Sequence, residues 1–305
     1  MTTHQPLISV VIATYNRVDL LKHQLHHLLT QSFDLSAYEI IVINDGSTDS
    51  TAVYMKNMVK NFPNIHYMET QNGGPAKARN KGVAMAKGQI IAFTDDDCLA
   101  DYHWLENIWR HFQDEELIAI QGKTITNINA VTPLTHQVIN EYGDTSIPTC
   151  NAAYRKATLE SLGGFDEGFP FQNEDADLAW RARESGKVIF AEDVLILHPP
   201  RTDSFRRNMR KMKNYISEFM LYYKNPTLYK KYRYANPWVT IYWRIMVKAQ
   251  GFHFTRRIKF YKKPLLMIQG FALSLYWWLD LIVKFPEFLK ANNFYRTQYK
   301  SHNRV

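Results

Sequence analysis

Three consecutive carboxylates are the residues whose types and spacing point most directly to chemistry. Asp95, Asp96 and Asp97 follow the apolar run QIIAF at residues 89–93. A solvated turn before a helix accounts for one or two of them, because the first turn of a helix favours acidic side chains. Three like charges at a buried strand end are relieved most simply by a divalent cation, and Mg²⁺ or Mn²⁺ takes oxygen ligands that it commonly shares with phosphates. These residues therefore predict a metal site for a phosphate-containing ligand.

Other ligand-binding signatures fit the sequence less well. Asp95, Asp97 and Glu106 match the first, third and last positions of a calcium-binding EF-hand loop, but Leu99 and Ala100 stand where that loop needs an oxygen ligand and a glycine. The motifs GxxxxGK[ST] and GxGxxG are absent. We therefore exclude an EF-hand and find no signature of P-loop NTP hydrolysis or of dinucleotide binding.

A second group of carboxylates, Glu174, Asp175 and Asp177, lies in GGFDEGFPFQNEDADLAWRARESG at residues 163–186. Apolar residues at spacings of three and four predict a helix here, and Gly186 ends it. Acids at a helix start contribute ~0.3–1 kcal/mol each, which explains one such residue more readily than three. A carboxylate opposite the metal site could act as a general base on an incoming hydroxyl group.

These residues are expected to be positioned by alternating strands and helices. Apolar, β-branched runs predict strands, and the segments between them predict helices. The predicted helix at 47–62 is expected to begin with Ser and Thr caps. This alternation is typical of an α/β fold with a doubly wound, mostly parallel sheet, in which ligands bind outside the carboxyl ends of the strands. The predicted strands are 7–13, 38–44, 64–69, 89–93 and 117–122, and the predicted helices are 20–31, 47–62 and 75–88.

Polar loops follow four of the predicted strands and are expected to open on the same edge of the sheet. They are Thr14-Tyr15-Asn16-Arg17, Asp45-Gly46-Ser47, Gly73-Gly74 and Asp95-Asp96-Asp97. Turn and cap chemistry alone also favours such residues at strand ends. Asp45 and Gly46 in addition offer a carboxylate and a backbone N–H group to a small polar ligand, and Arg79 on the next helix could face a phosphate.

Five segments resemble the family 2 glycosyltransferases, which have a GT-A fold. They are SVVIATYNR, IVINDGSTDST, NGGPAKARNKG, FTDDDC and GGFDEGF…NEDADLAWR, in this order and within residues 7–198. The resemblance implies an inverting transfer of a sugar from a nucleotide-diphospho-sugar to an acceptor hydroxyl. The QxxRW motif of processive polysaccharide synthases is absent, which favours transfer of a single residue.

The resemblance also implies roles on the donor side. Thr14 and Tyr15 would line the nucleotide pocket, and Asp45, beside Gly46, would accept a hydrogen bond from the base, most typically uracil. Arg79 would lie near the nucleotide.

The acidic residues carry the remaining implied roles. Asp95 would lie towards the ribose and the metal, Asp97 would hold the Mg²⁺ or Mn²⁺ that bridges the diphosphate, and Asp96 is left open because three acids permit two registers of the family's DxD motif. Glu174-Asp175 matches the family's ED pair, which makes Asp175 the candidate catalytic base. His198 stands where some members carry a metal or phosphate ligand, although a histidine at a strand end is more often structural.

The two parts of the chain differ in charge. Residues 1–200 contain 15 Lys and Arg against 25 Asp and Glu, and residues 201–305 contain 22 against 4, within a formal net charge of +8. The latter range also holds 24 of the 42 aromatic residues. We therefore predict a catalytic domain at 1–199 and a basic, aromatic helical region at 200–305.

The basic region contains a candidate membrane-binding helix at 264–285. Within it, residues 265–283 carry Asp280 as their single charge and approach the ~20 residues that span a bilayer. Gln269 and Asp280 make a span costly, so we expect an interfacial helix on an anionic membrane surface. The alternative is a soluble helical appendage whose aromatic residues form its own core.

The expected location is cytoplasmic, at the inner face of the cell membrane. Cys98 and Cys150 are too few for a disulfide framework, and MTTHQPLISVVIATYNR has no basic region of a signal peptide. The expected function is transfer of a sugar to a sugar or lipid-linked acceptor in cell-surface polysaccharide or glycolipid assembly, with a UDP-sugar as the expected donor. The alternatives are a non-catalytic nucleotide-sugar or lipid-binding module and, less favoured, a nucleic-acid-binding protein, for which no RRM, KH or zinc motif is present.

Overall fold

The chain divides into two compact units. The computed structural model describes residues 5–233, 236–249 and 260–300. Unit 1 consists of Met1–Asn127, Val138–Glu167 and Glu174–Pro199, and unit 2 consists of Ile128–Gln137, Gly168–Asn173 and Pro200–Val305. Two segments that precede Pro200 in the sequence thus belong to unit 2.

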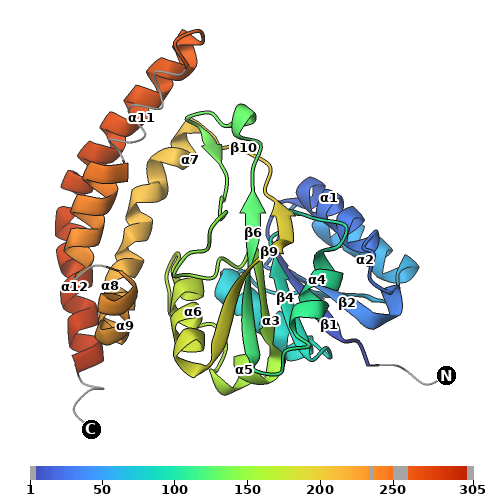
Figure 1. Ribbon diagram of the computed structural model, residues 1–305. Helices are drawn as coiled ribbons and strands as arrows, with labels where there is room; N and C mark the ends of the chain where they lie inside the picture. The colour runs from blue at the N-terminus through green and yellow to red at the C-terminus, as the bar shows by residue number, and fades with distance from the viewer. Residues whose placement is uncertain (1–4, 234–235, 250–259, 301–305) are drawn as a thin grey trace. The chain divides into compact units, whose positions relative to one another are not determined.

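Unit 1 is built on a sheet whose strand order is β3-β2-β1-β4-β8-β6-β9-β5 (Figure 1). The pairs β1–β2, β2–β3, β1–β4 and β6–β9 are parallel, and β8 runs antiparallel to both β4 and β6. The predicted α/β fold with a mostly parallel sheet is confirmed. The strands are β1 (Ile8–Thr14), β2 (Tyr38–Asn44), β3 (Ile65–Glu69), β4 (Ile90–Thr94), β5 (Leu99–Ala100), β6 (Leu117–Ile125), β8 (Asn151–Arg155) and β9 (Lys187–Leu197).

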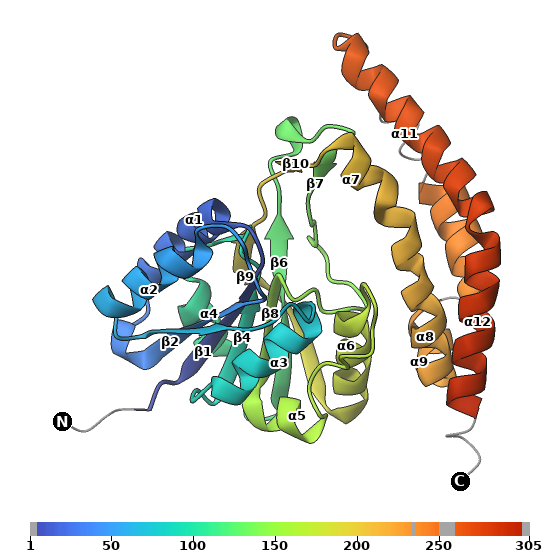
Figure 2. The same cartoon turned by 180° about the vertical axis from the view of Figure 1, so that it is seen from behind.

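Helices cover both faces of this sheet, as Figures 1 and 2 show from opposite sides. The helices α1 (Val18–Leu29), α2 (Thr51–Asn61) and α4 (Trp104–His111) pack on one face through a shared apolar core. The helix α3 (Pro75–Met85) lies on the other face, where a Cβ atom at Gly82 would clash with Val11. The remaining helices of unit 1 are α5 (Lys156–Ser161) and α6 (Glu174–Ser185), with a short 3-10 helix, η1 (Leu35–Ala37), before β2.

The start of α2 differs from the prediction. The helix begins at Thr51 and Ser50 makes no capping hydrogen bond through its side chain. The carboxylate of Asp49 takes that role instead, because it accepts hydrogen bonds from the backbone N–H groups of Thr51, at 3.0 Å, and Val18, at 3.1 Å. Asp49 therefore ties the starts of α1 and α2 together.

Unit 2 is helical, as predicted for the C-terminal region, and it has an apolar core of its own, which the alternative interpretation of that region expected. Phe219, Ile241, Leu281 and Phe288 are fully buried in that core, and aromatic rings such as Trp238 pack around them. A two-stranded antiparallel pair, β7 (Thr135–His136) with β10 (Arg201–Thr202), belongs to the same unit. Its helices are η2 (Ile128–Ala130), α7 (Phe205–Met209), η3 (Arg210–Ile216), α8 (Ser217–Lys224), α9 (Pro226–Tyr232), η4 (Val239–Ala249), α11 (Pro264–Val283) and α12 (Phe285–Lys300).

The helix α11 presents an apolar stripe to solvent. Among the described residues it is the one helix long and apolar enough to cross a membrane, and 22% of its most apolar window is buried. Asp280 is buried on the other side and pairs with Lys284 at 3.3 Å. Six exposed apolar side chains of α11 recur every three or four positions and so share one face. This apolar stripe consists of Leu265, Ile268, Ala272, Leu275, Leu279 and Ile282, and Trp278 and Val283 are exposed as well.

Candidate functional site

Asp96 joins the loops that follow β1 and β4. Thr14, the last residue of β1, donates a hydrogen bond from Oγ1 to Oδ2 of Asp96 at 2.7 Å. Arg17 donates to Oδ1 of Asp96 at 2.8 Å and lies 3.4 Å from Oδ2 of Asp97. Asp96 is 1% exposed, and burial raises its pKa to about 6 although the Arg17 guanidinium opposes that shift. The middle acid of the triplet thus holds two loops of the site together.

Asp95 belongs to a second ion-pair network, which reaches α6. Arg79, on α3, donates from Nη2 to Oδ1 of Asp95 at 3.1 Å and from Nη1 to Oε1 of Glu174 at 3.0 Å. Burial opposes the charge of Arg79, but the two carboxylates outweigh it and raise its pKa. One buried guanidinium therefore connects the acidic triplet with the Glu174-Asp175 pair. Arg79 was expected near the nucleotide, and in the structure both Nη atoms of its guanidinium donate to carboxylates.

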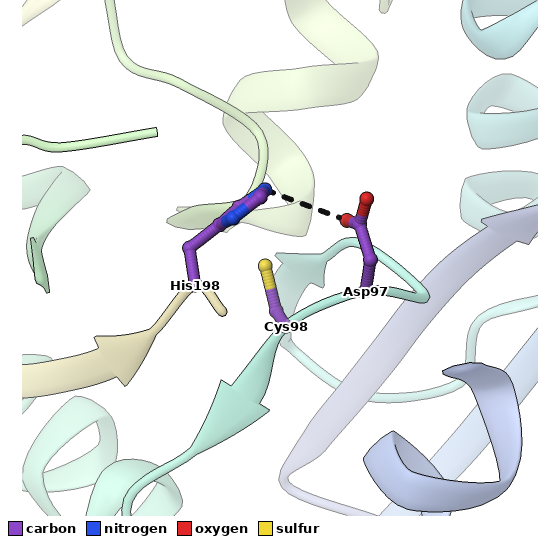
Figure 3. Close-up of side chains that lie close together, drawn as sticks. All are labelled: Asp97, Cys98 and His198. Atoms are coloured by element: carbon purple, nitrogen blue, oxygen red, sulfur yellow. Dashed lines mark ion pairs between the residues drawn. The ribbon is translucent and has the colours of Figure 1, made fainter. Parts of the chain in front are cut away.

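Asp97 and His198 form the group best suited to a divalent cation (Figure 3). Nε2 of His198, just after β9, lies 3.6 Å from Oδ1 of Asp97, and ligand atoms of Asp97, Cys98 and His198 all lie within 4.8 Å of one another. Two ligand atoms that each lie about 2.1 Å from one ion are about 3 to 4.2 Å from each other. The 3.6 Å between Oδ1 of Asp97 and Nε2 of His198 falls within that range. A hydrogen bond with Cys150 and burial raise the pKa of the Cys98 thiol, and a protonated sulfur suits neither Mg²⁺ nor Mn²⁺.

The three acidic residues at the N-terminus of α6 lie in different environments. Glu174 is buried against Arg79, whereas Asp175 is half-buried and accepts a hydrogen bond from the backbone N–H of Ala176 at 2.7 Å. Asp177 is buried and receives two hydrogen bonds from Arg181, which also donates to the backbone of the preceding loop. Asp177 is thus part of a structural brace, and Asp175 is the carboxylate of this group with solvent access.

The loops after β2 and β3 also meet. Both oxygens of the Asp45 carboxylate accept hydrogen bonds, from the backbone N–H of Gly73 at 2.8 Å and of Gly74 at 2.9 Å. Gly46 has a φ of +79°, and a Cβ atom there would lie 2.9 Å from the backbone nitrogen of Asn72, which explains the glycine. Tyr15, in the first loop, is 47% exposed. All the predicted loops therefore lie at the same edge of the sheet. Both carboxylate oxygens of Asp45 already accept hydrogen bonds from the loop that follows β3.

Two polar residues of the site, Arg17 and Asn16, were missed as structural contributors. Arg17 pairs with Asp96 and Asp97 from within the first loop, and the one signal for this in the sequence is its place in the polar loop after the first strand. Asn16 has a φ of +53° and accepts a hydrogen bond from the backbone N–H of Thr48 at 2.7 Å, which fastens the first loop to the second. Asn151 holds Trp104 and the backbone of β6 and β9 through three hydrogen bonds.

Comparison with known proteins identifies a matching family and several similar proteins. The sequence matches the family described as "Glycosyl transferase family 2" over residues 9–166. It is 26% identical over 246 residues to "Glycosyltransferase AglE" of Haloferax volcanii, covering 72% of this chain and 77% of that protein. It is 28% identical over 186 residues to "Minor teichoic acid biosynthesis protein GgaA" of Bacillus subtilis, covering 56% of this chain and 42% of that longer protein.

Solved structures show the same fold. A mannosyltransferase, PcManGT, from Pyrobaculum calidifontis in complex with GDP-Man and Mn²⁺ has a TM-score of 0.62 and 20% identity, covering 97% of this chain and 88% of that chain. S. aureus TarS 1-349 in complex with UDP-GlcNAc has a TM-score of 0.56 and 14% identity, covering 92% and 91%. At such identities the likeness concerns the fold alone, and it confirms the predicted GT-A architecture.

Proposed function

Because the chain belongs to glycosyl transferase family 2, we propose that it is a metal-dependent, inverting enzyme that transfers a single sugar from a nucleotide-diphospho-sugar to an acceptor hydroxyl. The observation that carries this proposal is the Arg79 bridge. Its hydrogen bonds to Asp95 and Glu174 bring the acidic triplet and the start of α6 to one place. A cation-binding group and a separate carboxylate beside it are what such a transfer requires.

The division of labour follows from the environments of the carboxylates. Asp175 would accept the proton of the acceptor hydroxyl, whose oxygen then attacks the anomeric carbon from the face opposite the diphosphate, so that the configuration inverts. Asp97 and His198 would hold the divalent cation, with Asp95 towards the ribose side. The ion would neutralise the negative charge of the departing diphosphate. Arg79, hydrogen-bonded to Asp95 and Glu174, would hold the two groups next to each other.

The donor is proposed to be a UDP-sugar, bound by Thr14, Tyr15 and the Asp45-Gly46 loop. Nucleotide-sugars bound in the two solved neighbours carry GDP and UDP, so the base needs a direct test. A ligand that binds only the folded state at 100 times its Kd stabilises that state by about 2.7 kcal/mol. We expect UDP-sugars to raise the melting temperature in the presence of Mn²⁺, and to do so much less without it.

The measurement is a thermal-shift screen of UDP-, dTDP- and GDP-sugars with and without Mn²⁺. A shift with GDP- or dTDP-sugars alone would refute the UDP assignment. Absence of any metal-dependent shift would refute the nucleotide-sugar proposal itself. Binding of a donor that no acceptor mixture ever consumes would instead identify a non-catalytic binding module.

We further propose that the enzyme acts in cell-surface polysaccharide or glycolipid assembly, at the inner face of the cell membrane. A curated relative is named for teichoic acid biosynthesis, which supports the first part. The apolar stripe of α11 and the basic composition of residues 201–305 support the second, because an interfacial helix combines exposed apolar side chains with nearby cations. The acceptor would be a sugar or a lipid-linked sugar.

Membrane attachment predicts a specific effect of charge on the apolar stripe. Ile268 and Leu275 are 60% and 61% exposed, and burial of each in lipid contributes ~1.5–3 kcal/mol. The double variant Ile268→Asp/Leu275→Asp is therefore expected to lose at least about tenfold in binding to vesicles that contain anionic lipid, measured by co-sedimentation. The matched control, Val53→Asp/Val59→Asp, adds the same charges to exposed positions of α2 and should bind as the wild type does.

Equal vesicle binding by both double variants would refute the proposal that α11 contacts the membrane. If the wild type is oligomeric and only the stripe variant is monomeric, with no vesicle binding by either protein, the stripe is an interface between copies of the chain.

A further inference from the structure

Arg17 places a positive charge beside the carboxylate that is proposed to hold the cation. Its Nη1 atom lies 3.4 Å from Oδ2 of Asp97, while Oδ1 of the same carboxylate lies 3.6 Å from Nε2 of His198. The two oxygens of Asp97 thus have different neighbours, a guanidinium group at one and an imidazole ring at the other. None of the roles proposed above uses Arg17.

The local structure fixes the position of Arg17. Its Nη1 atom also donates to Oδ1 of Asp96 at 2.8 Å, and Asp96 is 1% exposed. On either side of Arg17, the backbone N–H groups of Asn16 and Val18 donate to side chains of the loop after β2, at 2.8 Å and 3.1 Å. The first loop therefore presents the guanidinium group to Asp97 before any ligand binds.

Arg17 is charged and remains accessible to an anion. Burial opposes its charge, but Asp96 and Asp97 outweigh burial and raise its pKa. Its side chain is 29% exposed. Within the described part of the chain, its Nε and Nη2 atoms donate no hydrogen bond and are not enclosed by protein. An anion that arrives from solvent can therefore reach these two nitrogen atoms.

This charge has opposite effects on the two components that the site must bind. A divalent cation held by Asp97 and His198 would lie close to the guanidinium group, and like charges repel strongly where solvent is partly excluded. A diphosphate is negatively charged, so the same group attracts it. The ion should therefore bind weakly to the protein alone and more tightly once the diphosphate is present.

We propose that Arg17 makes binding of the divalent cation depend on the nucleotide diphosphate. Arg17 acts through Asp97 and takes no part in the transfer itself, so it is a positioning residue. The inference rests on the proposed function, from which it takes the cation and the diphosphate. The competing explanation is that Arg17 only ties the loops after β1 and β4 together.

The test measures binding of Mn²⁺ and requires no sugar transfer. The free ion is followed by its electron paramagnetic resonance signal, first with the full-length protein alone and then with UDP or, separately, GDP. A titration of each nucleotide with Mn²⁺ corrects for the complex that they form in solution. Arg17→Gln is expected to bind Mn²⁺ alone at least about fivefold more tightly than the wild type does, because the substitution removes the repulsion.

The nucleotide provides the second measurement. One of the two nucleotides should tighten Mn²⁺ binding at least about tenfold in the wild type and several-fold less in Arg17→Gln, and Mn²⁺ must tighten nucleotide binding by the same factor. Two control variants are Arg17→Lys, which keeps the charge, and Lys22→Gln, which removes a cation from an exposed pair with Asp19 on α1. Both should bind Mn²⁺ within about twofold of the wild type, since exposed ion pairs contribute little.

The direction of the change separates the effect of charge from a structural role. Loss of a structural tie can only loosen the site, so Mn²⁺ binding by Arg17→Gln that is equal to or weaker than that of the wild type would overturn the proposal. Mn²⁺ binding by the wild type that neither nucleotide tightens would overturn it as well. If Arg17→Gln fails to fold, Arg17→Met replaces it, because methionine keeps an unbranched stem without the charge.

Failure of this inference and failure of the proposed function give different results. If Mn²⁺ and a nucleotide both bind and only the effect of Arg17 is missing, the inference alone is wrong. If the wild type binds neither Mn²⁺ nor a nucleotide, the proposed function is wrong and the inference fails with it.

Discussion

Replacement of Asp175 by asparagine is expected to lower the rate of sugar transfer about 10²–10⁴-fold, because a positioned general base contributes that much to such a reaction. Asparagine keeps the size of the side chain and can still interact with the backbone at the start of α6, but it cannot accept the proton. Donor binding should therefore remain at the wild-type level. The measurement is kcat for transfer together with the Kd of the donor in the presence of Mn²⁺.

The neighbouring acid provides the control for this experiment. Asp177 lies on the same helix but pairs with Arg181 at 2.7 Å and is buried. Asp177→Asn should lower the melting temperature, because it weakens the brace that holds the preceding loop, while the folded protein retains most of its kcat. Full activity in Asp175→Asn would refute the assignment of the base.

Replacement of Asp97 by asparagine is expected to lower the rate of sugar transfer at least about 10³-fold. It should also abolish most of the effect of Mn²⁺ on donor binding. A bound metal ion contributes several kcal/mol to stabilisation of the leaving group, and 1.36 kcal/mol corresponds to tenfold in rate. The substitution removes the carboxylate of Asp97, which is the negatively charged group in its pair with the His198 imidazole. The measurements are kcat and the difference in donor Kd with and without Mn²⁺.

Cys98 offers the matched control at this place. Its thiol lies in the same group of side chains, but its raised pKa disfavours the thiolate that would bind a metal. Cys98→Ala should cost some stability through the lost volume and leave the dependence on Mn²⁺ unchanged. A loss of metal dependence in Cys98→Ala with none in Asp97→Asn would reverse the assignment of ligands.

The arrangement of unit 1 was predictable wherever short apolar strands alternate with helices. The expected strand at 38–44 coincides with β2, and the strands expected at 7–13, 64–69 and 89–93 each differ by one residue. The strand β6 extends three residues beyond the expected 117–122. Strand β8 was not predicted, because its sequence NAAYR has no β-branched residue and its place between β4 and β6 is set by tertiary packing. The cap of α2 was predicted wrongly because several polar residues in STDST can serve as a cap.

The positions of the site residues were easier to predict than their partners. That the polar loops meet follows from the parallel strands that precede them. The hydrogen bond between Thr14 and Asp96 and the bridge from Arg79 to Glu174 join residues 82 and 95 positions apart, and no local pattern encodes such a contact. The proposed roles of Asp175, Asp97 and His198 stay predictions until the variants are measured.

The alternation of the chain between the two units bears on how shortened proteins should be interpreted. Residues 168–173 belong to unit 2, where the side chain of Asn173, with a φ of +79°, donates to Glu218 at 3.1 Å and the N–H of Gln172 bonds Ser217 at 3.4 Å. A fragment that ends at Pro199 would keep Asp97, Asp175 and His198 but lose both of those partners immediately before α6. Inactivity of such a fragment would report a loosened α6, which carries the proposed base, as readily as loss of the proposed membrane contact. Point variants on α11 are therefore better suited than deletions to separate the two causes.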